Sequence, residues 1–112
     1  MDVQDLVAGI EDELRSVATP ERAAGEKQYL KSDLEFLGAT MPEISKATKR
    51  VHRAHPDLSR TNVVALVRRL WRPGIFELRM AATKVLKLYH HRLTAKEVPL
   101  IERLLRESRT WA

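Results

Sequence analysis

The sequence predicts an all-α domain of about six helices, arranged as repeated helical hairpins. Apolar residues recur at helical spacing along nearly the whole chain, and no stretch shows a sustained period of two. The stripes are Leu6, Ile10, Leu14 and Val17; Leu30, Leu34 and Leu37; Ile44, Ala47 and Val51; Val63, Leu66, Val67 and Leu70; Met80, Val85, Leu86 and Leu88; and Val98, Ile101, Leu104 and Leu105. We therefore predict helices over residues 2–17, 20–36, 42–55, 60–71, 75–92 and 95–108.

Residue types that favour helix starts precede most of these segments. The expected N-cap residues are hydroxyl side chains: Thr19, Thr40, Ser59 and Thr94. Thr40 and Thr94 are each followed three residues later by Glu, which is the spacing of a capping box. Gly38 suits a left-handed cap at the end of the helix over 20–36, and Pro73-Gly74 predicts a turn.

The helix starts predict a repeat. Starts at residues 20, 42, 60, 75 and 95 make a helix pair recur about every 36 to 40 residues, near the ~40–47 of HEAT and armadillo repeats. Stacked hairpins bury apolar stripes that single helices cannot, and they curve into a solenoid with a concave face. An ordinary six-helix bundle is the alternative.

Length and composition predict one domain, residues 1–112, without a membrane span. The chain has 112 residues and no cysteine, which excludes disulfides and thiolate metal sites and fits a reducing cytoplasm. No apolar run approaches the roughly 18 residues of a membrane helix, and the first residues are acidic where a signal peptide is basic. We expect a cytoplasmic protein.

Charge is distributed unevenly along the chain. Residues 1–40 carry 4 Lys/Arg against 9 Asp/Glu, a net charge of −5, whereas residues 41–112 carry 16 against 6, a net charge of +10. A basic segment of this kind favours a polyanionic partner.

The basic residues form rows at helical spacing. Lys46, Lys49, Arg50 and Arg53 make one ridge on the helix over 42–55. Lys84, Lys87 and His91 repeat the spacing on the helix over 75–92, and Arg103, Arg106 and Arg109 follow the last helix. If alternate helices share a layer, the first two rows form a groove that follows phosphates. Solvated, merely solubilising faces are the alternative.

No cofactor or metal site is expected. The pairs His52/His55 and His90/His91 invite a metal interpretation, but no carboxylate stands at helical ligand spacing beside both pairs, so structural or surface roles are favoured. Neither a Gly-rich phosphate loop nor a nucleophile elbow is present.

An ordered set of segments resembles one known family. The set begins with Tyr29-Leu-Lys-Ser-Asp-Leu-Glu-Phe-Leu-Gly38 and Pro42, and continues with Leu70-Trp71, Glu77-Leu-Arg79, Ala81-Ala82, Pro99-Leu-Ile-Glu102 and Thr110-Trp111. In this order and spacing, over about residues 12 to 112, the chain resembles the AlkD-type DNA alkylation repair family, which are HEAT-like-repeat DNA glycosylases.

The resemblance implies a fold and an activity. It implies a right-handed superhelix of helical hairpins whose basic concave face holds duplex DNA. It also implies metal-independent hydrolysis of the N-glycosidic bond of N3- and N7-alkylated purines, with aromatic side chains and a carboxylate acting on the sugar and backbone.

The resemblance also assigns residues. Trp111 matches the first of two active-site tryptophans and is the catalytic candidate. Arg109, from the last basic row, is a further candidate for DNA binding. Tyr29 matches a DNA-facing tyrosine, and Thr40 matches a position close to the lesion. Trp71, Glu77 and Arg79 match packing and buried ion-pair positions.

The chain departs from the family pattern after Trp111. The family's catalytic aspartate follows that tryptophan by four residues, and the sequence ends at Ala112. We therefore expect a truncated, amino-terminal part of the enzyme that binds DNA, does not excise bases by itself, and self-associates through its exposed carboxy-terminal repeat end. A non-catalytic HEAT-like scaffold is the alternative function; a helix-turn-helix regulator is disfavoured because no tight turn isolates a recognition helix.

Overall fold

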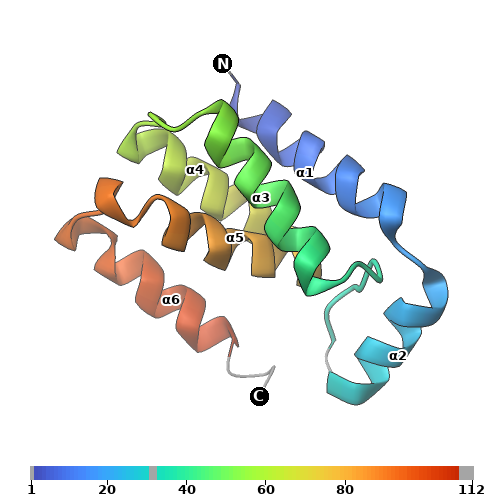
Figure 1. Ribbon diagram of the computed structural model, residues 1–112. Helices are drawn as coiled ribbons and strands as arrows, with labels where there is room; N and C mark the ends of the chain where they lie inside the picture. Colours follow the sequence, from blue (N-terminus) through green and yellow to red (C-terminus); the bar gives the residue numbers. More distant parts are fainter. Residues whose placement is uncertain (1, 31–32, 109–112) are drawn as a thin grey trace.

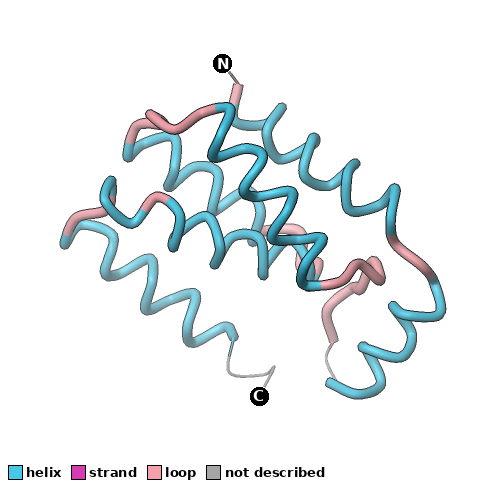
Figure 2. Tube along the Cα trace, in the orientation of Figure 1, coloured by secondary structure: helices cyan, strands magenta, loops and turns pink. Residues whose placement is uncertain are grey.

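The computed structural model describes residues 2–30 and 33–108, apart from the side chains of residues 105, 107 and 108. Within these ranges all regular elements are helical, as predicted (Figures 1 and 2). They are α1 (Val3–Val17), α2 (Pro20–Leu30), α3 (Met41–Ala54), α4 (Arg60–Trp71), α5 (Phe76–Leu88), the short 3₁₀ turns η1 (His90–Arg92) and η2 (Ala95–Glu97), and α6 (Val98–Ser108). The described residues contain one isolated parallel β-bridge, between Glu35 and Ile75, and no named strand.

Three helices lie side by side on one face of the molecule. Helix α3 packs between α1 and α5, and α4 packs against α1 and α5 behind it (Figure 1). Successive helices from α3 to α6 alternate in direction, so α3 and α5 run the same way. The predicted shared layer for these two helices is confirmed, whereas a repeating solenoid stays a prediction.

The core is formed by one stripe from each of α1, α3, α4 and α5, and it also includes Leu100 and Leu104 of α6. Its fully buried members include Ile10, Leu14, Ile44, Leu66 and Leu78. At roughly 25 cal/mol per Å² of apolar area, burying each side chain of this size contributes about 1.5–3 kcal/mol. The stripes predicted for α3 and α4 are buried, as expected. On α5 the buried apolar side is formed by Leu78, Ala81, Ala82 and Val85, so the predicted stripe there is correct only at Val85, and α2 buries none of its residues.

Two predicted stripe residues at helix ends are exposed. Val17 is 42% exposed at the last residue of α1, and Val98 is 47% exposed at the first residue of α6. On α1 the buried stripe instead begins with Val3 and Val7. At a helix end, apolar spacing predicts burial poorly, because no neighbouring helix has to cover that residue.

The predicted N-caps are confirmed by hydrogen bonds. The hydroxyls of Thr19, Thr40 and Ser59 each accept a hydrogen bond from the backbone N–H three residues later. At Thr94, the Glu97 carboxylate closes a capping box by accepting the Thr94 backbone N–H at 2.6 Å. That bond, together with an ion pair to Arg60, holds the Glu97 pKa at about 2, below its ordinary value, although burial opposes the shift.

The prediction that a helix covers 20–36 is wrong at its end. Helix α2 stops at Leu30 and buries none of its residues, and residues 35–40 run outside any helix into α3. Glu35 pairs with Ile75 in this loop, and Gly38 has a φ of 96°. Gly38 thus needs its left-handed conformation, as predicted, but in the loop and not at a helix terminus.

Two further boundaries differ from the sequence prediction. The segment 75–92 contains α5 only as far as Leu88, followed by η1, and the segment 95–108 begins with η2 before α6. Tyr89 marks the first boundary: its ring is fully buried, and its hydroxyl donates a hydrogen bond to the His55 carbonyl at 2.7 Å. Tyr89 thus anchors the end of α5 to the end of α3, and α5 stops there. The local sequence does not reveal this long-range contact. Across the described residues no helix has the length and apolarity needed to span a membrane.

Candidate nucleic-acid interface

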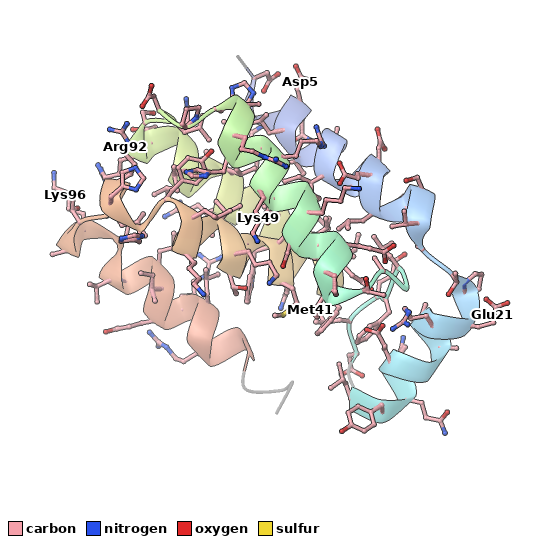
Figure 3. All side chains as sticks on the ribbon, viewed as in Figure 1. Asp5, Glu21, Met41, Lys49, Arg92 and Lys96 are labelled. Atoms are coloured by element: carbon pink, nitrogen blue, oxygen red, sulfur yellow. The ribbon has the colours of Figure 1, made fainter. Side chains whose placement is uncertain are left out.

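A hollow of about 370 Å³ lies between α3 and α5. It is lined by Ser45, Thr48, Lys49, Lys84, Lys87, Leu88 and His90. Three of the basic residues predicted for DNA binding, Lys49, Lys84 and Lys87, therefore meet at one site, which we call the α3–α5 groove. Figure 3 shows Lys49 on the outward side of α3.

The predicted ridge on α3 is exposed along its length. Ile44, Ala47, Thr48 and Val51 form the buried side of α3. Lys46, Lys49, Arg50 and Arg53 occupy the opposite side and are all exposed. One edge of this ridge borders the α3–α5 groove through Lys49, so the ridge and the groove form a continuous basic surface.

Most cations of this surface have no carboxylate partner. Among ion pairs between described residues, none involves Lys46, Lys49, Arg53, Lys84 or Lys87. Arg50 differs, because its Nε lies 2.6 Å from Oε1 of Glu13 on α1. Unneutralised positive charge at close spacing is self-repulsive and attracts a polyanion.

The carboxylate of Glu77 fixes the entry to α3. Glu77 is completely buried in the first turn of α5, and its oxygens accept the backbone N–H groups of Leu37 and Gly38, both at 2.9 Å, and of Ala39 at 3.3 Å. These residues directly precede Thr40, the N-cap of α3. Glu77 thus ties the start of α3 to the start of α5, the two helices whose side chains form the groove.

The resemblance implies packing and buried ion-pair positions for Trp71, Glu77 and Arg79, and the structure gives the contacts of each. Glu77 is buried as expected, but its described partners are backbone N–H groups. Arg79 donates from Nε to the Trp71 carbonyl at 3.1 Å, and its guanidinium carbon lies 4.7 Å from the centre of the Trp71 ring. Trp71 is 3% exposed, which confirms its packing position.

The remaining predicted site residues are not gathered at the groove. Tyr29 is 85% exposed near the end of α2, which lies apart from α5 (Figure 1). Thr40 stands at the amino-terminal end of α3, where its N–H donates to the Glu43 carboxylate at 2.7 Å and thereby lowers the pKa of Glu43. Trp111 and Arg109 lie outside the described residues.

The two histidine pairs make different contacts, and the rings of His90 and His91 meet edge-on at 5.8 Å between centroids. The His52 ring meets Tyr89 edge-on at 4.8 Å between centroids, and His90 Nδ1 lies 3.0 Å from the Lys87 carbonyl oxygen. Within the described part of the chain, no three His, Asp or Glu side chains are grouped so as to hold a metal ion.

Sequence reasoning missed three polar members of the groove, Ser45, Thr48 and His90. Ser45 precedes Lys49 by four residues, so it shares the flank of Lys49 on α3, and helical spacing alone could have predicted it. Thr48 lies on the buried side of α3, and its place in the groove does not follow from its spacing to Lys49. Thr48 is 1% exposed, and its hydroxyl donates to the Ile44 and Ser45 carbonyls, so it closes the floor of the groove without a free donor.

The sequence itself identifies the family. A family model described as DNA alkylation repair enzyme matches residues 10–112, which is nearly the whole chain. No curated protein matches the sequence. A match of this extent includes α2 to α6, with the basic residues of α3 and α5, and the second half of α1. The chain belongs to the DNA alkylation repair enzyme family.

Proposed function

We propose that this chain binds duplex DNA along the basic surface of α3 and α5, as the DNA-binding part of a glycosylase that excises N3- and N7-alkylated purines. Membership of the family supports DNA as the substrate. The observation that carries the proposal is the α3–α5 groove, where Lys49, Lys84 and Lys87 converge without carboxylate partners among the described residues.

The electrostatics favour a phosphate backbone over a protein partner. Lys46, Lys49, Arg53, Lys84 and Lys87 are five cations with no ion pair inside the described structure. Contacts from Lys and Arg to phosphates release condensed counterions, so the affinity falls steeply with salt. Five such contacts give a slope of log affinity against log salt of about −4.5, or a loss of about 500-fold between 50 and 200 mM salt.

The expected chemistry needs groups outside this groove. Alkylation at N3 or N7 places positive charge on the purine and makes it a good leaving group, and the sugar then passes through a cationic, oxocarbenium-like state. A carboxylate beside the sugar stabilises that state, and the face of a tryptophan, proposed here to be Trp111, attracts the positive charge. The described lining of the α3–α5 groove contains no carboxylate, so this surface supports binding and not bond cleavage.

A salt titration with matched variants tests the proposal. The Lys84→Gln/Lys87→Gln double variant should weaken binding to a short duplex and reduce the magnitude of the salt slope by about 1.8, because two phosphate contacts are lost. The Arg69→Gln/Lys96→Gln variant removes the same charge from exposed residues elsewhere and should retain the original slope. Fluorescence anisotropy at several salt concentrations measures both.

Two outcomes would contradict the proposal. Equal slopes for both double variants would show that net charge, and not the α3–α5 groove, attracts DNA, and would favour the protein-binding scaffold. Release of 7-methylguanine from alkylated duplex by residues 1–112 would contradict the assignment of binding without cleavage to this part of the enzyme.

A further inference from the structure

A second basic hollow lies where α4, α5 and α6 meet. Its volume is about 160 Å³, and its lining residues are Arg68, Trp71, Arg72, Arg79, Leu100, Arg103 and Leu104. It shares no lining residue with the α3–α5 groove. Four of the seven lining residues are arginines and none is acidic. We propose that this arginine pocket binds a phosphate group, as a monoester or diester.

The floor of the arginine pocket is preorganised. Trp71 is almost fully buried at the end of α4, and Arg79 from α5 is held against it by a hydrogen bond to its carbonyl and by stacking over its ring. A guanidinium that is already oriented loses little conformational entropy when it binds an oxyanion. Two helices thus fix one side of the pocket before any ligand enters.

The walls of the pocket carry positive charge that the described structure does not neutralise. Arg68, Arg72 and Arg103 are exposed, and none takes part in the ion pairs formed between described residues. Three guanidinium groups around one hollow repel one another, and a multiply charged anion between them removes that repulsion.

The pocket suits phosphate by shape as well as by charge. Its volume of about 160 Å³ is several times the roughly 30 Å³ that one water occupies in the liquid, so a tetrahedral oxyanion fits. Arginine presents a planar fork of N–H donors that pairs with two phosphate oxygens at once, and arginines from α4, the turn after it and α6 offer several such forks.

Binding of inorganic phosphate tests this site without reference to DNA. The thermal unfolding midpoint is measured in phosphate and in chloride at equal ionic strength, together with ³¹P line broadening of phosphate on addition of protein. The wild-type chain should show a higher midpoint in phosphate than in chloride. The Arg72→Gln/Arg103→Gln variant should bind phosphate at least tenfold more weakly.

The control removes two charges from the other basic surface. The Lys46→Gln/Arg53→Gln variant should keep the wild-type response to phosphate. The Arg72→Lys/Arg103→Lys variant keeps the charge and loses the planar forks, so its affinity should lie between those of the wild type and the Gln variant. Absence of a phosphate response in the wild type, or an unchanged response in the Arg72→Gln/Arg103→Gln variant, would overturn the proposal.

A second arm identifies the source of the phosphate, and this arm alone rests on the proposed function. If the pocket takes a phosphodiester of bound duplex, the Arg72→Gln/Arg103→Gln variant should also lower the magnitude of the DNA salt slope by about one to two. If the slope is unchanged while the response to inorganic phosphate is lost, the pocket takes a free phosphate ester. Both results support the pocket, and failure of the groove variants would concern the proposed function alone.

Discussion

Replacing Glu77 by Gln tests how the groove is held together. The Glu77 carboxylate accepts three backbone N–H groups from residues 37–39. A glutamine of the same shape offers one acceptor oxygen and places an NH₂ group against the remaining N–H donors. The variant should therefore lose stability and loosen the start of α3 relative to α5.

The expected loss can be worked from these contacts. Hydrogen bonds to a charged group contribute about 1.5–3 kcal/mol each, and at least one of the three is lost outright. Relief from burying a carboxylate offsets part of this, so we expect a net loss of about 1–2 kcal/mol. The total free energy of unfolding of a domain is about 5–15 kcal/mol, so this loss is a large fraction of it.

Urea unfolding followed by tryptophan fluorescence and by helical circular dichroism measures this loss. The exposed Glu102→Gln variant, which removes the same charge from α6, should change the unfolding free energy by less than about 0.5 kcal/mol. The reasoning would be refuted if Glu77→Gln were as stable as the wild type, because desolvation of the carboxylate would then outweigh its three hydrogen bonds.

Three further substitutions follow from single contacts. Gly38→Ala should lower the free energy of unfolding in urea by at least about 2 kcal/mol, because the left-handed φ is strained for Ala and the new Cβ would lie 2.1 Å from the Thr19 carbonyl oxygen. An unchanged free energy of unfolding would contradict the loop geometry. Tyr89→Phe should cost about 1 kcal/mol by the same measurement, because the His55 carbonyl loses its donor, whereas Tyr29→Phe should have no effect. Glu97→Gln should lower the free energy of unfolding at pH 7. The difference in unfolding free energy from the wild type should shrink as the pH falls from about 4.5 through about 2. The pKa of Glu97 is depressed in the folded chain, so its charge contributes stability above the unfolded pKa, and this contribution is lost as the carboxylate protonates. A difference that stays constant over this range would show that the Glu97 charge does not contribute.

The sequence predicted those parts of the fold that depend on neighbouring residues. The starts of α3 and α4 were located correctly because Thr40 and Ser59 cap their own helices. The ridge on α3 could also be predicted from the sequence, since helical spacing alone places Lys46 and Lys49 opposite Ile44.

The parts that the sequence did not reveal depend on distant residues. The apolar spacing of Leu34 and Leu37 continues that of α2, but the loop is drawn out by Glu77, about 40 positions along the chain. The groove likewise needs Lys84 of α5 and Ser45 of α3 to line one hollow, which no local pattern specifies. The arginine pocket unites residues of three helices for the same reason.

Mapping the DNA-binding surface residue by residue tests the central claim most directly. In a titration of the ¹⁵N-labelled chain with a short duplex, amide chemical shifts report which helices meet the DNA. We expect the largest changes along the exposed side of α3 and in the second half of α5, around Lys49, Lys84 and Lys87. Changes confined to α1 and α2, with α3 and α5 unaffected, would contradict the assignment of the α3–α5 groove as the DNA interface.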